Sequence, residues 1–400
     1  MRILVAAATN LAFSVLAPLM AQDAYFPEDR DRVEVPLELV DFGLYGTQLF
    51  VTVDIGGEKG RFQLDTGANL AIDQAFAERL GLERTTALLG IGVTQPDLPY
   101  TFRVPLLRLG SVELENYLAI ALDLESFDDG AEGLIGLDLL SFAVVEIDAP
   151  GRRLVLHEPD TFEPPEGGEP IRLLPALYGV ECRTTRRQRW IIDTGNSSAV
   201  LLHGPFVRRH DLAANRDAFL QQTMFGVFGE HEVLVGQLAE LRLGGLQLRG
   251  FPVDLTDPNA TGGGAGSALH AGNLGMTLFA SLVMLIDGPR RTMRLRAPDG
   301  ADTIVYRDAM GLALGGDDAV AVLDVAAGSP AHGQGIAAGD VLVAIDGRRV
   351  RDHSRAAQQL RAADQVRLTL RPGDAGDELE VTLRRRAWLT TVELPVDQPR

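Results

Sequence analysis

The chain has 400 residues, 46% of them hydrophobic, which is enough for two or three domains with sizeable cores. Its formal net charge of −18 is spread along the sequence, which indicates a soluble surface and argues against a nucleic-acid partner. Cys182 is the single cysteine, so an internal disulfide is excluded.

The N-terminus has the pattern of an export signal. Arg2 supplies a positive charge, and residues 3–20 are largely apolar until Ala21 precedes the polar Gln22. We therefore expect a signal peptide at residues 1–21, no stable membrane span after its cleavage, and an exported protein that is periplasmic or secreted. A membrane anchor through an uncleaved N-terminal segment is the alternative, because the apolar stretch is about long enough to cross a bilayer.

From Val35 onward the sequence predicts short strands separated by glycine turns, and one tripeptide occurs twice among them. Asp65-Thr66-Gly67 and Asp193-Thr194-Gly195 each end a strand-like run. A helix is expected after each copy, at residues 73–80 and 204–212. Either copy alone would be an ordinary turn, but the matched settings indicate a duplicated fold that brings two carboxylates together.

The duplication extends beyond the tripeptides. Matched segments are 107–110 with 241–244, 133–136 with 272–275, and 147–148 with 286–287. The tripeptides lie 128 residues apart, which is far longer than a solenoid repeat and indicates paired lobes. We expect the lobes at residues 35–158 and 171–297, joined by a linker at 159–170 that is rich in Pro, Glu and Gly.

A third unit is expected at residues 304–388. It combines a strand at 319–323, glycine-containing turns near residues 328 and 339, a helix at 355–362 and two further strands.

Paired aspartates suit general acid–base hydrolysis. Two carboxyl groups about one hydrogen bond apart cannot both ionise, so they share a proton over a wide pH range. The ionised group can take a proton from a water held between them, while the protonated group polarises a peptide carbonyl. Glycine allows the two loops to approach closely, and threonine can hydrogen-bond across their junction. The candidate residues are Asp65 and Asp193 as the catalytic pair, braced by Thr66, Gly67, Thr194 and Gly195.

Other catalytic constellations find little support. The seven histidines are scattered without a His-Glu-x-x-His pattern, so we expect no metal. The sequence has no Gly-x-Ser-x-Gly motif, and the glycine-rich loop at 261–266 lacks the ending of a phosphate-binding loop. We expect no cofactor.

The duplicated motifs resemble the retropepsin-like aspartic proteases of bacteria in which two lobes are fused in one chain. The resemblance covers about residues 35–297. It implies a mainly β fold in which two acid-protease lobes form a bilobal pseudo-dimer with a cleft between them. It also implies a substrate-binding flap at Gly90, Ile91 and Gly92, with residues 225–229 at the equivalent place in the second lobe. Asn196 and Asn273 depart from the family pattern, which leaves the pH optimum open.

The third unit resembles a small α+β PDZ domain of the kind attached to exported bacterial proteases. Gly311, Leu312, Ala313 and Leu314 correspond to its carboxylate-binding loop, which implies capture of C-terminal peptide tails by addition of a strand. A domain that packs on the protease without binding peptide is the alternative.

Together these features predict an exported aspartic endopeptidase that acts on peptides or unfolded proteins, with the PDZ-like domain recruiting or positioning the substrate. The alternative is a catalytically silent peptide-binding or scaffolding protein of the cell envelope. A third hypothesis is a structural envelope protein in which the PDZ-like domain alone is functional.

Overall fold

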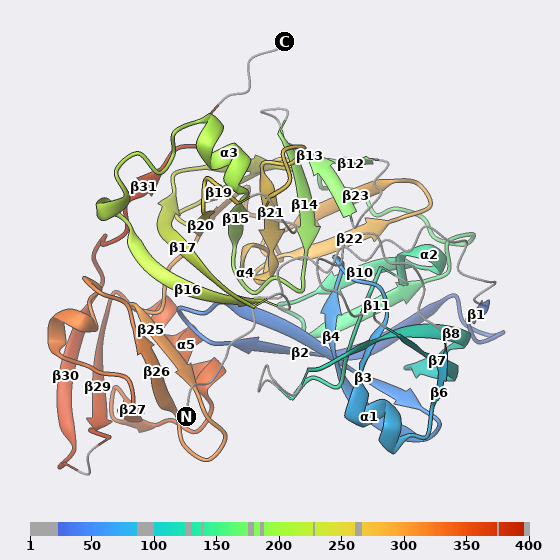
Figure 1. Cartoon of the computed structure of the whole chain (residues 1–400), viewed down its shortest axis with the longest axis horizontal. Helices are drawn as coiled ribbons and strands as arrows, with labels where there is room; N and C mark the ends of the chain where they lie inside the picture. The colour runs from blue at the N-terminus through green and yellow to red at the C-terminus, as the bar shows by residue number, and fades with distance from the viewer. Residues whose placement is uncertain are drawn as a thin grey trace.

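The computed structural model describes residues 23–85, 100–124, 130–137, 139–174, 180–184, 188–226, 229–260, 266–373 and 376–395. The expected signal peptide and the expected flap residues Gly90, Ile91 and Gly92 lie outside these ranges. The prediction of a mainly β fold is confirmed (Figure 1). Among the described residues, no helix is both long and apolar enough to cross a membrane.

The first half of the chain is built from a sheet with one face on the core. In β2, Val33, Val35 and Leu37 are buried while the residues between them are exposed, as the period of a half-buried strand requires. The expected helix at 73–80 is observed as α1, which begins after Asp73 because that carboxylate accepts the N–H of Phe76 at 3.0 Å. The elements are β1 (Asp23–Tyr25), β2 (Arg32–Asp41), β3 (Thr47–Ile55), β4 (Glu58–Asp65), β5 (Ala71–Asp73), α1 (Gln74–Arg79), β6 (Glu83–Thr85), β7 (Thr101–Leu109), β8 (Val112–Leu122), β9 (Gly133–Gly136), α2 (Leu139–Phe142), β10 (Val144–Asp148) and β11 (Arg153–His157).

The second half repeats the pairing pattern around its own tripeptide. The expected helix at 204–212 is shorter, ending at Arg209 with His210 as its C-cap. The elements are β12 (Ile171–Leu174), β13 (Val180–Arg183), β14 (Arg189–Asp193), β15 (Val200–Leu202), α3 (Gly204–Arg209), η2 (Arg216–Ala218), β16 (Leu220–Gly226), β17 (Gly229–Leu238), β18 (Leu241–Leu243), β19 (Leu246–Arg249), β20 (Pro252–Thr256), β21 (Gly272–Gly275), α4 (Met276–Phe279), β22 (Val283–Asp287) and β23 (Thr292–Arg296).

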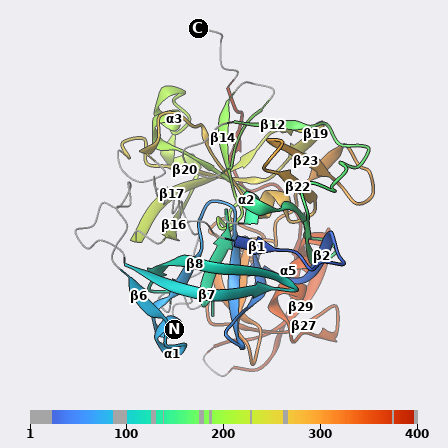
Figure 2. The same ribbon diagram turned by 90° about the vertical axis from the view of Figure 1, so that its right-hand side faces the viewer.

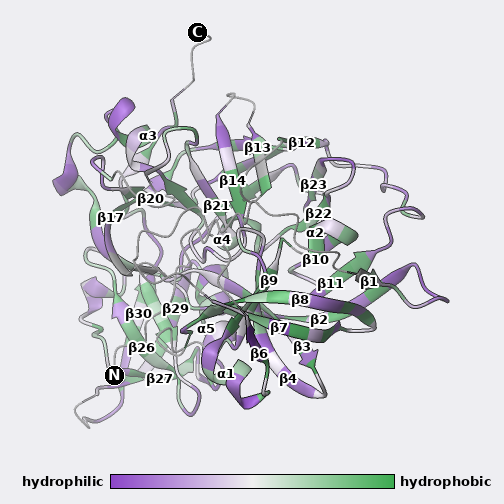
Figure 3. Ribbon diagram, turned by 45° about the vertical axis from the view of Figure 1, so that its right-hand side comes forward, coloured by the Kyte–Doolittle hydropathy of each residue, from purple (hydrophilic) through white to green (hydrophobic). Residues whose placement is uncertain are grey.

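Strands from both halves form one antiparallel sheet. Its order is β2, β11, β10, β22, β23 and β12, so the pair β10–β22 joins the halves. Seen from the side, the second half lies above the first (Figure 2). Strands such as β8, β9 and β22 are largely hydrophobic, while hydrophilic residues occupy the outer turns (Figure 3). A shared core therefore fixes how the two tripeptide loops face each other.

The C-terminal part forms a separate small sheet with one helix on it, in orange and red in Figure 1. The expected helix at 355–362 starts two residues earlier, because the Asp352 carboxylate accepts the N–H of Arg355 at 3.0 Å and caps it. Strand β24 (Thr303–Val305) precedes this sheet and pairs with β19 of the second half. The elements that follow are β25 (Leu312–Gly315), β26 (Ala321–Val325), η4 (His332–Gln334), β27 (Val341–Ile345), β28 (Arg348–Arg349), α5 (His353–Ala362), β29 (Gln365–Arg371), β30 (Leu379–Arg384) and β31 (Thr391–Val392).

The chain does not stay in this small sheet to its end. Strand β31 returns to the second half and pairs in parallel with β17 (Figure 1). Val392 and Leu394 are 4% and 3% exposed and belong to the large core that both halves share. The residues that follow β30 therefore complete the core of the second half.

Candidate active site

The two Asp-Thr-Gly loops meet where β4 and β14 end. In each half, a second strand runs parallel to the first and ends beside the aspartate. Asp65 is level with Gly136 of β9, and Asp193 is level with Gly275 of β21. The same local register in both halves places the two aspartates in equivalent backbone settings.

The threonines lock the two loops together. The N–H of Thr66 donates to Oγ1 of Thr194 at 3.0 Å, and the N–H of Thr194 donates to Oγ1 of Thr66 at 3.1 Å. Each hydroxyl then donates into the opposite half, Thr66 to the carbonyl of Ile192 at 3.0 Å and Thr194 to that of Leu64 at 2.7 Å. Four buried hydrogen bonds thus hold the loops in one geometry.

Glycine is required in both loops by close approach. A Cβ atom added to Gly195 would lie 2.2 Å from Cγ of Asp65, and one added to Gly67 would lie 2.9 Å from Oδ1 of Asp193. Behind the first loop, a Cβ atom on Gly136 would lie 1.6 Å from the carbonyl oxygen of Asp65. A side chain at any of these positions would push the carboxyl groups apart.

The two carboxyl groups are buried and interact directly. Asp65 is 2% exposed and Asp193 is 1% exposed, and their side chains hydrogen-bond to each other. Burial raises the pKa of Asp65, although the N–H of Gly67, 2.7 Å from Oδ1, opposes this. Burial, and then the charge of Asp65, raise the pKa of Asp193 well above its ordinary value. The arrangement favours a pair that holds one shared proton.

A polar chain behind Asp193 has no counterpart among the described residues of the first half. Nδ2 of Asn273 donates to Oδ2 of Asp193 at 2.8 Å. Oδ1 of Asn273 lies 2.8 Å from Nε2 of His203, and because an amide oxygen only accepts, the imidazole is the donor. Burial lowers the pKa of His203 to about 4, so the ring is neutral at physiological pH. The fully buried Asn273 therefore supports the ionised form of Asp193.

Sequence reasoning did not find this pair. Asn273 was noted as a departure from the family pattern, and His203 was counted among scattered histidines. A comparison of the two halves could have revealed it. Asn273 lies two residues before Gly275 on β21, and the matched position on β9 of the first half, two residues before Gly136, holds the apolar Leu134. A polar residue in a buried position, where the matched position of the first half holds leucine, needs a hydrogen-bonding partner.

The structure describes only part of the residues expected to form flaps. Residues 90–92 lie outside the described ranges, between β6 and β7. In the second half, β16 and β17 form an antiparallel hairpin whose last described pair is Gly226 with Gly229. These described strands flank the expected segment 225–229, whose role over a substrate stays a prediction.

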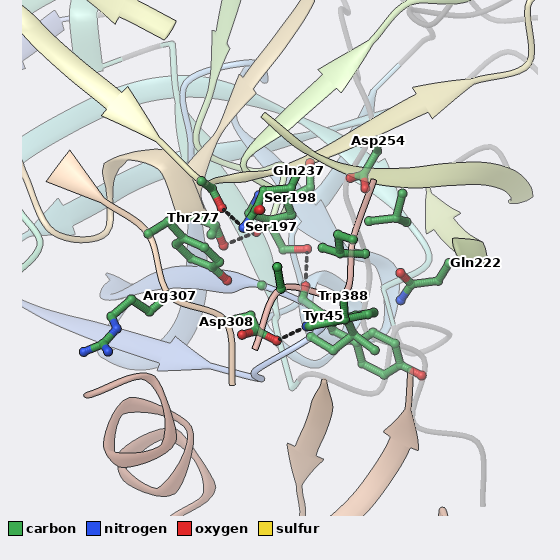
Figure 4. A pocket seen from close by; sticks show the side chains of 18 of the residues that line it. Tyr45, Ser197, Ser198, Gln222, Gln237, Asp254, Thr277, Arg307, Asp308 and Trp388 are labelled. Atoms are coloured by element: carbon green, nitrogen blue, oxygen red, sulfur yellow. Dashed lines mark hydrogen bonds between the residues drawn. The ribbon is translucent and has the colours of Figure 1, made fainter. Parts of the chain in front are cut away.

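A cavity of about 310 Å³ lies beside the second loop (Figure 4). Ser197 and Ser198 line it together with Met224 of the β16–β17 hairpin and Trp388 of the C-terminal segment. Asp254 also lines it, and burial raises the pKa of this carboxyl to about 7. This cavity adjoins the residues that follow Asp193, so it can accept a group from a bound peptide.

The expected PDZ loop lies in the small sheet, apart from the two aspartates. Gly311 has φ +81°, and Leu312, Ala313 and Leu314 form most of β25. One edge of β25 pairs with β26, and the backbone of its other edge pairs with the segment that follows β2. Residues 42–44 cover this edge in the structure, and capture of C-terminal tails by Gly311, Leu312, Ala313 and Leu314 stays a prediction.

Within the described residues there is no group of three or more His, Cys, Asp or Glu side chains arranged to hold a metal ion.

Comparisons with known proteins identify two segments. Residues 51–139, which include Asp65, match a family model described as aspartyl protease, and residues 322–372 match a model described as PDZ domain. A search of curated proteins gave no match. Among solved structures, a crystal structure of a retropepsin-like aspartic protease from Rickettsia conorii matches at 19% identity and a TM-score of 0.24, covering 34% of this chain and 96% of that chain. On the two family-model matches, the chain carries a segment similar to aspartyl proteases and a segment similar to PDZ domains.

Proposed function

We propose that the chain is an exported aspartic endopeptidase that hydrolyses peptide bonds with a water molecule activated between Asp65 and Asp193. The observation that carries the proposal is the buried carboxyl pair, held by the reciprocal threonine hydrogen bonds. Neither carboxyl group has a cationic partner among its hydrogen bonds, so the pair is free to exchange protons. Export rests on the pattern of residues 1–21, and peptides or unfolded proteins are the proposed substrates.

The proton balance follows from the two environments. Asp65 accepts several backbone hydrogen bonds and is the better site for the negative charge, while Asp193 is the better site for the proton. Water attacks the peptide carbonyl carbon, one water proton passes to Asp65, and the proton of Asp193 passes to the carbonyl oxygen. When the C–N bond of the tetrahedral intermediate breaks, the leaving nitrogen takes the proton from Asp65. A hydroxyl of the intermediate then returns its proton to Asp193, which restores the starting state.

The dyad is tested by two nearly isosteric substitutions. Asp65→Asn and Asp193→Asn should each lower kcat on a quenched internal peptide by about 10³-fold or more, and the double variant should lose little further, because the residues act as a unit. The fold should persist, since each change is nearly isosteric and prevents the pair from carrying two negative charges. Asp148→Asn, which alters another buried aspartate, is the matched control and should keep activity. If both single variants hydrolyse peptides at nearly the wild-type rate, the chain is not an aspartic peptidase.

The same assay separates a catalytically silent peptide-binding protein from an enzyme. A silent protein would bind a transition-state-mimicking peptide without turning over an unfolded protein. An enzyme would turn it over and be inhibited by the mimic.

A further inference from the structure

The groove between β25 and α5 holds a piece of the same chain. Residues that follow β2 pair with β25 in the antiparallel sense, with Gly43 level with Ala313. The N–H of Leu314 donates to the carbonyl of Phe42 at 3.1 Å, and the N–H of Leu44 donates to the carbonyl of Leu312 at 2.8 Å. This is the backbone arrangement by which an extended peptide adds a strand to a sheet edge.

Side chains fix the segment against the helix. The ring of Phe42 stacks on His353, the first residue of α5, with centroids 5.3 Å apart and an interplanar angle of 23°. Nε and Nη2 of Arg361 donate to the two carboxylate oxygens of Asp41, each at 2.9 Å. The N–H of Asp41 donates to Oγ of Ser354 at 3.0 Å. Helix and strand therefore both contribute contacts, as the two walls of a peptide groove do.

Glycine at position 43 is what allows the close fit. Gly43 has φ +69°, and a Cβ atom there would lie 2.2 Å from the carbonyl oxygen of Leu312. No other residue type fits this position without moving the segment away from β25.

The segment continues directly to the loop that carries Asp193. Oγ of Ser197 donates to the carbonyl of Tyr45 at 3.0 Å, and the N–H of Thr47 donates to the carbonyl of Ser197 at 3.0 Å. The hydroxyl of Tyr45 donates back to Asp324 in the small sheet at 3.1 Å. The groove and the second aspartate loop thus hold the same stretch of backbone.

We propose that the PDZ groove is a receptor for residues 41–45 of its own chain and, through them, ties the PDZ domain to the Asp193 loop. A free C-terminal tail can add to β25 only after this segment leaves, so tail capture and support of the loop exclude each other. The inference goes beyond the proposed function, and its tests by binding and hydrogen exchange do not require the chain to be an enzyme.

The first test uses the unmodified protein. Backbone amides of Leu44, Thr47 and Leu314 should exchange as slowly as those of the core strands, because each donates within the assembly. A fluorescein-labelled peptide of residues 36–45 with a free carboxylate should show no saturable binding. Fast exchange at all three amides, or saturable binding that leaves their exchange unchanged, would overturn the proposal.

The second test compares two glycines with similar backbone angles. Gly43→Ala introduces the collision with Leu312, whereas Gly56→Ala, at φ +64° with nothing within 4 Å of the added Cβ, introduces backbone strain alone. Gly43→Ala should increase the open fraction of the groove and bind the labelled peptide saturably. Gly56→Ala should show no saturation up to about ten times the peptide concentration that half-saturates Gly43→Ala, since apparent affinity scales with that fraction. It should also speed exchange at Thr47.

A third variant guards against loss of folding. Phe42→Ala removes the ring on His353 without straining the backbone, and it should likewise expose the groove to the labelled peptide. Circular dichroism establishes that each variant is folded before binding is measured. Equal peptide affinity for wild type, Gly56→Ala, Gly43→Ala and Phe42→Ala would refute an occupied groove.

Discussion

Replacing Asn273 by leucine tests the asymmetry of the dyad. The change places in the second half the residue type that Leu134 supplies at the matched position of the first half. It removes the amide that donates to Oδ2 of Asp193 at 2.8 Å and leaves His203 without its acceptor. Of the two aspartates, only Asp193 loses a hydrogen bond that supports its ionised form, because Asp65 makes no hydrogen bond to Asn273.

The size of the effect follows from the geometry. A hydrogen bond to a buried charged group contributes about 1.5–3 kcal/mol, which corresponds to about one to two pKa units. Its loss disfavours ionised Asp193, so the pKa of this group should rise. Asp193 is the member of the pair that holds the shared proton, so the alkaline limb of the activity profile should move to higher pH by about one to two units. The acid limb, which reports mainly on Asp65, should move less.

The assay is kcat/KM against pH on one quenched peptide, because this ratio reports the pKa values of the free enzyme. His203→Phe is the companion variant. It frees the amide of Asn273 without deleting it, so a smaller shift in the same direction is expected. Urea unfolding of both variants establishes that they are folded. An alkaline limb that stays in place, or moves to lower pH, would refute the assigned role of Asn273.

Three further predictions concern stability. Burial raises the pKa of Asp254 in the folded protein from 3.8 to about 7, so the free energy of unfolding of the wild type should fall by up to about 4 kcal/mol as pH rises from about 4 to 7. Asp254→Asn should therefore have a higher urea midpoint than the wild type at pH 8. An equal midpoint at that pH would count against the raised pKa. Arg361→Gln strands a buried carboxylate and should lower the free energy of unfolding by about 3–5 kcal/mol, whereas Arg355→Gln, in an exposed pair, should cost under about 1 kcal/mol. Leu394→Ala should lower the free energy of unfolding by about 2–4 kcal/mol because this side chain is 3% exposed in the shared core. The control Leu379→Ala alters an exposed side chain and should have almost no effect. Similar thermal midpoints for the two variants would show that the C-terminal segment does not support the second half.

The return of the C-terminal segment also determines how the chain can be truncated. A protein ending near Ala297 would retain both tripeptides, but it would lose β24, β31 and the buried Leu394. Such a truncation removes part of the core of the second half, so it does not isolate the contribution of the PDZ domain.

The sequence by itself determined the features that depend on neighbouring residues. A strand-like run that ends in Asp-Thr-Gly needs only local geometry, so the pattern predicted the mainly β class. The second copy in a matched setting then predicted that Asp65 lies beside Asp193. Helix positions followed from periodicity, but their ends depended on individual capping side chains such as Asp352, which is why the predicted start of that helix was two residues late.

Tertiary structure decided the contacts between residues far apart in the chain. Asn273 and His203 are 70 positions apart, and nothing in either neighbourhood states that their side chains meet behind Asp193. The segment in the PDZ groove depends even more on tertiary structure. The sequence around Gly43 predicts only an ordinary glycine turn, and its contact with Leu312 appears only in the folded protein. Which strand covers an exposed sheet edge is set by how whole units pack together, since backbone hydrogen bonds at an edge accept any extended segment of suitable shape.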